Sequence, residues 1–227
     1  MNTFLISIAL LLGITSCNSA SQKSNQTENT VSYEKMGSDT LVNFENETEG
    51  KLPSGFVADA TNKAKSIKWN VINDIGNKVV VQQAENSGSC YNLLVLDKVA
   101  YNDFSASVKI KAISGEEDQG GGLVWRYIDK NNYYVARYNP LENNFRFYRV
   151  VDSKREELKS ADSDIKQGEW FTMTIEMKRN KVTCSLNGDK LIESTDDTFK
   201  SAGLIGFWTK ADAVTYFDDL KINASNN

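Results

Sequence analysis

Aromatic, guanidinium and amide side chains recur at alternate positions in several short stretches of the chain. If Phe145, Phe147, Ile205 and Phe207 point into a core, their alternates point the opposite way. Applying the same alternation to the neighbouring stretches predicts one shared face. Its residues are Arg126, Tyr133, Arg137, Asn139, Tyr148 and Trp208, and Lys210 and Asp212 lie on the loop that follows Trp208. A flat indole or phenol ring stacks on the apolar face of a pyranose, while guanidinium and amide groups bind its hydroxyls with defined geometry. The set therefore favours a saccharide-binding face.

A second interpretation leaves this face without a ligand. Trp208 then belongs to the core, and the arginines pair with Asp129, Glu142 or Asp212 on a solvated surface. Both interpretations depend on strand register, because a shift of one residue exchanges the two faces of a strand.

The absence of histidine from the whole chain limits the chemistry further. It excludes a Ser-His-Asp triad, a Cys-His pair and a histidine-ligated metal, so carboxylates, lysines and tyrosines are the remaining catalytic candidates. The alternating acids of residues 45–49 run into Gly50 and Pro53, which indicates a loop. The three glycines at 120–122 precede a predicted strand, so we expect a turn or bulge there and no phosphate loop.

The elements that must position these side chains are strands. Residues 104–112 and 170–178 alternate apolar and polar side chains, which is typical of antiparallel strands with one solvated face. Asn187-Gly188 predicts a type I′ hairpin between 184–186 and 190–192. Further strands are expected at 41–45, 68–72, 78–83, 92–96, 123–128, 133–138, 144–150, 182–186, 204–209 and 214–222. So many strands with almost no helix predict an all-β sandwich or jelly roll.

The first seventeen residues predict where the protein works. Residues 4–14 form an apolar run that is too short to span a bilayer and is typical of a secretory signal. It ends in Ile14-Thr15-Ser16-Cys17, which resembles a bacterial lipobox, in which the cysteine is lipidated. We therefore expect a signal peptide at 1–17, a flexible polar linker at 18–38 and one folded domain at 39–225. This predicts a bacterial envelope protein, periplasmic or on the cell surface, held to the membrane through Cys17.

The net charge bears on nucleic-acid binding, and the two cysteines after Cys17 bear on disulfide formation. With 26 Lys+Arg against 30 Asp+Glu, the net charge of −4 gives no electrostatic footprint for nucleic acid. Cys184 alternates with Val182 and Leu186 on an apolar face, so a buried free thiol is favoured there, with a Cys90–Cys184 disulfide as the alternative.

Three stretches together resemble the 3-keto-disaccharide hydrolase-type domain of the concanavalin A-like lectin/glucanase superfamily. They are residues 116–126 (EEDQGGGLVWR), residues 131–139 (NNYYVARYN) and the segment from Gly203 through Trp208-Thr209-Lys210-Ala211-Asp212 to Leu220. The resemblance covers about residues 41–222. It implies a jelly-roll sandwich of two curved antiparallel sheets, with carbohydrate chemistry on the concave face.

The resemblance also implies candidate roles. Family members described as enzymes remove the C2 proton of a 3-keto-glycoside, and the base would be Asp118, Glu142 or Asp212. Arg126, Arg137 or Lys210 would hold the developing enolate. The paired-glutamate pattern of family-16 glucanases is absent. No cofactor is implied apart from a structural calcium, for which Asp39, Glu45 and Asp218 are candidates.

Three functions therefore remain open. Saccharide recognition on the concave face leads, a 3-keto-glycoside hydrolase or lyase comes second, and a structural envelope module without a small ligand comes third.

Overall fold

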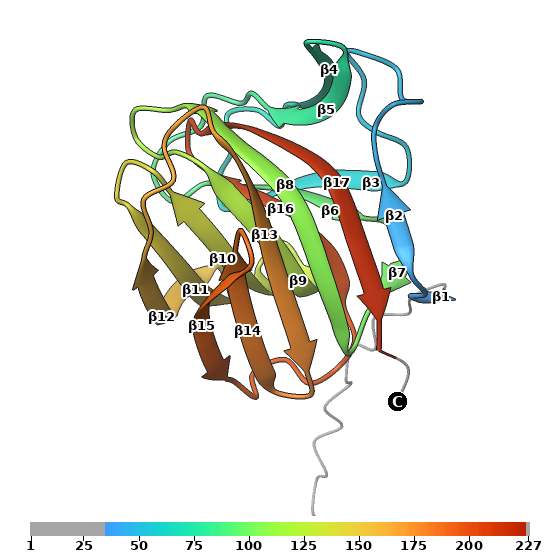
Figure 1. Ribbon diagram of the computed structural model, residues 1–227, viewed down its shortest axis with the longest axis vertical. Helices are drawn as coiled ribbons and strands as arrows, with labels where there is room; N and C mark the ends of the chain where they lie inside the picture. Colours follow the sequence, from blue (N-terminus) through green and yellow to red (C-terminus); the bar gives the residue numbers. More distant parts are fainter. Residues whose placement is uncertain (1–34, 226–227) are drawn as a thin grey trace, which may run out of the picture. The chain divides into compact units, whose positions relative to one another are not determined.

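The computed structural model describes residues 35–225, and the regular elements of this range are β-strands (Figure 1). No helix in this range is long and apolar enough to cross a membrane. The expected signal peptide at 1–17, with Cys17, and most of the linker at 18–38 lie outside the described residues. The described chain starts with β1 (Lys35–Met36), which pairs in parallel with β7 (Val99–Ala100). Paired structure thus begins inside the range expected to be the linker.

Seven antiparallel strands form one sheet, in the order β12-β11-β10-β9-β16-β6-β3. Their bounds are β3 (Phe56–Thr61), β6 (Tyr91–Leu96), β9 (Gly121–Asp129), β10 (Asn132–Asn139), β11 (Asn144–Val151), β12 (Lys154–Asp162) and β16 (Leu204–Lys210).

The second sheet has eight strands, in the order β15-β14-β13-β8-β17-β5-β4 with β2 also paired to β17. Their bounds are β2 (Thr40–Val42), β4 (Trp69–Asp74), β5 (Asn77–Gln82), β8 (Phe104–Ser114), β13 (Trp170–Lys178), β14 (Lys181–Leu186), β15 (Asp189–Thr195) and β17 (Val214–Ala224). In Figure 1 this sheet faces the viewer, and β9, β10 and β11 lie behind it. The expected two-sheet antiparallel jelly roll is confirmed.

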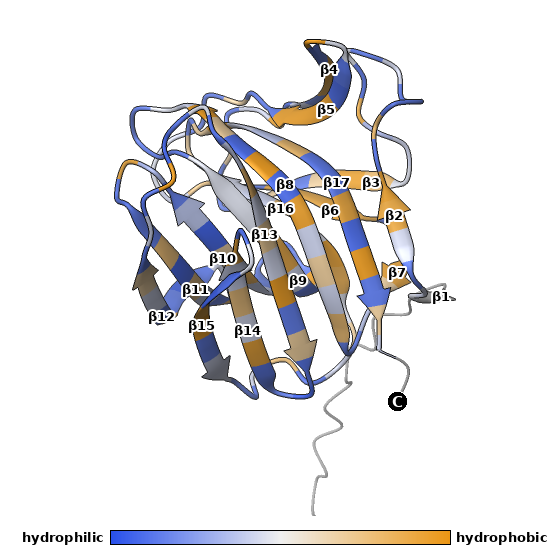
Figure 2. Cartoon of the chain, viewed as in Figure 1, coloured by the Kyte–Doolittle hydropathy of each residue, from blue (hydrophilic) through white to orange (hydrophobic). Residues whose placement is uncertain are grey.

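The main core lies between the two sheets and follows directly from the period-two pattern. On β8, Ala106, Val108 and Ile110 are buried, whereas Lys109 between them is exposed. Figure 2 shows the same alternation of hydrophobic and hydrophilic bands along β8, β13 and β17. Phe217 of this sheet stacks on Phe207 of the other, with ring centroids 4.8 Å apart. Alternation therefore places one apolar row from each sheet in the shared interior.

The seven-stranded sheet curls so far that its distant strands meet across its concave face. The Thr61 hydroxyl on β3 donates to the carbonyl of Lys130 in the β9–β10 turn and lies 2.7 Å from the Tyr133 hydroxyl on β10. Arg155 on β12 lies over the Tyr91 ring on β6, at 5.1 Å. In the sheet order, three strands separate β3 from β10 and four separate β12 from β6. A flat sheet with strands about 4.8 Å apart could not bring them together.

A second hydrophobic cluster fills much of this concave face. It is built from the residues that alternate with the main core: Tyr91, Leu93, Val95, Val124, Tyr127, Tyr133, Val135, Tyr148, Val150 and Trp208. The seven-stranded sheet is therefore apolar on both faces, which explains the near-continuous burial of β6, β9 and β10.

Several local predictions are confirmed. Asn187 and Gly188 have φ values of 51° and 89°, as a type I′ turn requires. Of the three glycines expected in a turn or bulge, Gly120 turns with φ 74°, whereas Gly121 and Gly122 lie within β9. Residues 45–49 form turns. Cys90 and Cys184 are both buried free thiols, so the alternative disulfide is wrong.

Two strands of the seven-stranded sheet, β12 and β3, were not expected from the sequence. β12 has the sequence KREELKSAD and lies at the sheet edge, where its exposed charges leave little apolar alternation to detect. β3 carries Ala58, Asp59 and Ala60 at its centre, and these residues have low strand propensity.

Replacing Gly122 with Ala would place a Cβ atom 1.8 Å from the carbonyl oxygen of Ala136 on β10. Because the atom in the way is backbone, β9 and β10 must separate, and we expect a loss of about 3 kcal/mol or more in the free energy of unfolding. Gly76→Ala is the matched control, since it meets open space at a φ of 87° and should cost about 1 kcal/mol. Denaturant unfolding compares the two variants, and equal losses would contradict the close approach.

Candidate functional site

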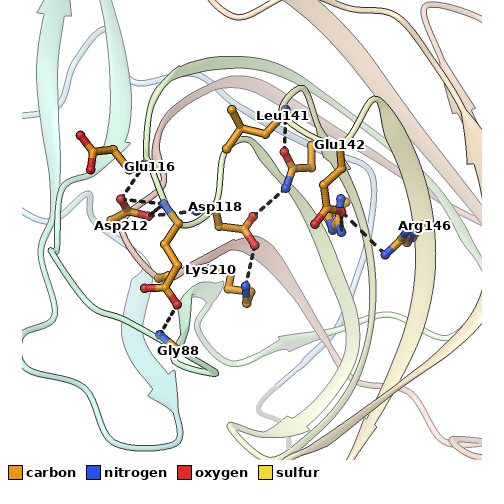
Figure 3. A network of polar contacts seen from close by, with 12 residues as sticks. Gly88, Glu116, Asp118, Leu141, Glu142, Arg146, Lys210 and Asp212 are labelled. Carbon is orange, nitrogen blue, oxygen red and sulfur yellow. Dashed lines mark hydrogen bonds and ion pairs between the residues drawn. The ribbon is translucent and has the colours of Figure 1, made fainter.

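A polar network lies at one end of the concave face, and its first part is the loop before β9 (Figure 3). The backbone N–H groups of Glu116, Glu117 and Asp118 donate to the Asp212 carboxylate, at 2.7, 3.1 and 3.0 Å. Burial alone raises the pKa of Asp212, but these backbone donors outweigh it and hold the pKa below its usual value. Asp212, one of the three candidate bases, therefore works as an ionised clamp on this loop, which is a poor position for a general base.

The clamped loop presents Asp118 to the concave side. Asp118 is only 3% exposed, and its two carboxylate oxygens accept from Asn139 Nδ2 at 3.1 Å and Lys210 Nζ at 2.8 Å. Burial raises the pKa of the Asp118 carboxyl, while the hydrogen bond from Lys210 and the nearby charges of Arg137 and Arg155 act against it. This buried anion is thus surrounded by cations from three different strands.

Arg137 connects Asp118's surroundings to the protein surface. Its guanidinium donates to Asn144 Oδ1 at 2.6 Å, Glu142 Oε2 at 2.8 Å and the Tyr148 hydroxyl at 3.2 Å. Burial raises the pKa of Glu142, but hydrogen bonds from Arg137 and Asn144 bring it below the usual value. The Glu142 side chain is 46% exposed and lies 3.7 Å from Arg146. Glu142 is therefore an ionised, accessible acceptor at a fixed position.

Arg155 is the functional candidate that sequence analysis missed. Its guanidinium lies over the rings of Tyr148, Tyr91 and Trp208, at 4.4, 5.1 and 5.6 Å from their centroids. The residue sits on β12, whose charged sequence carries no strand pattern. No sequence signal therefore pointed to it, because only the curl of the sheet brings β12 over β6.

The structure separates Arg126 from this network, so its expected place beside Arg137 is wrong. Arg126 has a φ of 45° at an irregularity in β9, which removes its side chain from the strand's alternation. Its guanidinium donates to the backbone carbonyls of Phe199, Asn102 and Arg179 and lines a separate pocket of about 390 Å³. Arg126 thus joins three loops.

Tyr133, Tyr148 and Trp208 lie on the expected face, but their rings are covered. Tyr133 and Trp208 are 0% and 1% exposed, and Trp208 Nε1 donates to the Tyr133 hydroxyl at 3.3 Å. The Tyr91 ring lies 5.3 Å from that of Trp208. Trp208 lies outside the core between the sheets, so strand alternation predicted the face of its side chain correctly. These rings are nevertheless covered, and they are not free to stack on a sugar.

The three acids considered for calcium do not form one cluster. Asp39 accepts from the Ala224 N–H, Glu45 from the Lys78 N–H, and Asp218 from Asn77. Within residues 35–225, no group of three or more carboxylates, histidines or cysteines is arranged to hold a metal ion.

Removing the clamp should change how stability depends on pH. The pKa of Asp212 is lowered by folding, so its contribution is present above about pH 4 and is lost as pH falls through the folded-state pKa. We expect Asp212→Ala to lose about 1–3 kcal/mol in the free energy of unfolding at pH 6, and the gap to the unmodified protein to shrink by pH 3. Urea titrations at both values measure this, with exposed Asp189→Ala as control. A gap that is independent of pH would contradict the clamp.

Comparisons with known proteins agree with this architecture. The carbohydrate-binding module CBM66 from Bacillus subtilis superimposes with a TM-score of 0.62 and 15% sequence identity, covering 75% of this chain and 96% of the module. Domain 4 of an extracellular arabinanase from Geobacillus stearothermophilus, in complex with arabinotriose, gives a TM-score of 0.55 and 15% identity, covering 83% and 93%. A β-glucanase from Bacillus licheniformis gives 0.56 and 8%, covering 83% and 99%. At such identities the likeness establishes the fold.

No curated protein sequence matches the chain. A family model does match, over residues 40–223, which includes both sheets, the clamped loop and Arg155. The chain therefore belongs to the family of 3-keto-alpha-glucoside-1,2-lyase-like domains.

Proposed function

We propose that this domain binds a saccharide at the polar end of its concave face. The accessible contacts are the side chains of Glu142, Arg146, Arg155 and Lys210, which are exposed or half-buried. The observation that carries the proposal is that buried partners hold two of these groups, Glu142 and Lys210, in place. Arg137 and Asn144 fix Glu142, and Asp118 fixes Lys210.

The chemistry of the network suits a polyhydroxylated ligand. Sugar hydroxyls both donate and accept, and here a carboxylate acceptor stands beside guanidinium and ammonium donors. Groups that are already ordered lose little conformational entropy when a ligand binds. The solved structures of similar fold support the proposal, because one is a carbohydrate-binding module and another holds arabinotriose.

Proton abstraction from a 3-keto-glycoside has less support from the geometry. Of the three candidate bases, Asp212 is engaged by the loop backbone and Glu142 has a lowered pKa. Asp118 has a raised pKa, but both of its oxygens already accept hydrogen bonds and it is almost fully buried. We therefore infer recognition rather than turnover as the function.

Removing Arg146 should weaken saccharide binding about tenfold or more, because charge-assisted hydrogen bonds contribute about 1.5–3 kcal/mol. Calorimetry with a panel of oligosaccharides compares Arg146→Ala with Arg149→Ala. Arg149 is the matched control, because it lies on the same strand with 31% side-chain exposure against 32%, but its side chain pairs with Asp196, outside the network. Equal losses in the two variants would place the binding surface elsewhere. Release of a keto-sugar from an oxidised disaccharide would favour the lyase over the binding module.

We also propose that the domain is attached to the bacterial envelope through a lipid on Cys17, as the sequence of residues 4–17 indicates. Cys17→Ser should abolish incorporation of a labelled fatty acid and move the protein from the membrane fraction to the soluble fraction. Ser16→Ala is the control, since it keeps the thiol. Fatty-acid labelling that persists in Cys17→Ser would contradict the anchor.

A further inference from the structure

The part of the network around Asp118 and Glu142, without the Asp212 clamp, carries more positive than negative charge, although the whole chain has a net charge of −4. We call its four cationic side chains, Arg137, Arg146, Arg155 and Lys210, the cationic cluster. Three carboxylates lie against them, those of Asp118, Glu142 and Glu157. An excess of cations held close together raises the local affinity for anions.

The cluster also holds guanidinium N–H groups that the protein does not satisfy. Arg137 Nε and Arg155 Nη1 are buried and have no hydrogen-bond partner among the described residues. Arg137 is only 1% exposed, so water cannot replace that partner freely. A guanidinium can only donate, and leaving a buried charged donor unpaired is costly. An acceptor that binds the half-buried Arg155 would remove part of this cost.

These two guanidinium groups lie against the same ring. Their central carbons are 5.8 Å and 4.4 Å from the centroid of Tyr148, for Arg137 and Arg155 respectively. Both also act electrostatically on Asp118. The rings of Tyr148, Tyr91 and Trp208 hold Arg155 through cation–π contacts, which stabilise its charge but leave hydrogen-bond donors available.

We propose that the saccharide bound by this domain carries a carboxylate, as in a uronic acid residue, and that the half-buried Arg155 receives it. This rests on the saccharide-binding function proposed above. A carboxylate is planar and only accepts, so it matches the guanidinium fork, whereas a neutral hydroxyl brings no charge to pair with the Arg155 guanidinium. Arg155 is then the residue that selects acidic over neutral sugars.

Calorimetry tests this with paired probes. Oligosaccharides of galacturonate, glucuronate and mannuronate are each compared with the same oligosaccharide after reduction of its carboxylates to alcohols. We expect at least one acidic member to bind about tenfold or more tightly than its reduced partner. This preference should weaken as salt is raised.

Variants of Arg155 then test whether this residue produces the preference for acidic over neutral sugars. Arg155→Gln should remove the preference for the acidic member, and Arg149→Gln should retain it. Arg155→Lys keeps the charge without the fork and should retain only part of the preference. If Arg155→Gln does not fold, as judged by near-ultraviolet circular dichroism, Arg155→Lys decides the question alone.

Failure of this inference is distinct from failure of the proposed function. If reduced and acidic oligosaccharides bind equally well, the acidic selectivity is wrong and saccharide binding stands. If a sulfated neutral oligosaccharide binds more tightly than every uronate, the assignment to a carboxylate is wrong. If neither acidic nor neutral oligosaccharides bind, both proposals fall.

Discussion

The curl of the seven-stranded sheet is the constraint on which the site depends. The two edge strands, β3 and β12, each bend over the concave face toward strands near the opposite edge. Thr61 on β3 therefore reaches Tyr133 on β10, and Arg155 on β12 reaches Tyr91 on β6. The glycines at the centre of the sheet permit the close approach of neighbouring strands, as at Gly122 against Ala136. Once the sheet curls this far, its concave face becomes a second interior.

That second interior divides into an apolar part and a polar part. Aromatic rings occupy the first, where Tyr133, Trp208 and Tyr91 cover one another. Next to the rings, the polar part is formed by Asp118, Arg137 and Lys210. The buried charges of Asp118 and Arg137 persist because each has partners. The clamp of Asp212 on the loop before β9 holds Asp118 at this boundary.

The aromatic residues and the arginines thus have roles other than those that residue type alone implies. The Trp208 ring is covered and lies against the Arg155 guanidinium. Arg126 and Arg137 have the same chemistry and lie on adjacent strands, yet one joins loops and the other organises the network. Positive φ at Arg126 makes this difference, because it takes the side chain out of the alternation that Arg137 follows.

The amino-acid sequence by itself determined the all-β class, most strand positions, the Asn187-Gly188 turn and the faces on which Tyr133, Arg137 and Trp208 lie, because period-two alternation is a local property. It could not show that the concave face is covered, nor that β12 brings Arg155 into it. Curl and bulges arise from interactions among strands far apart in the chain. Only the tertiary structure decided which side chains of the concave face stay accessible.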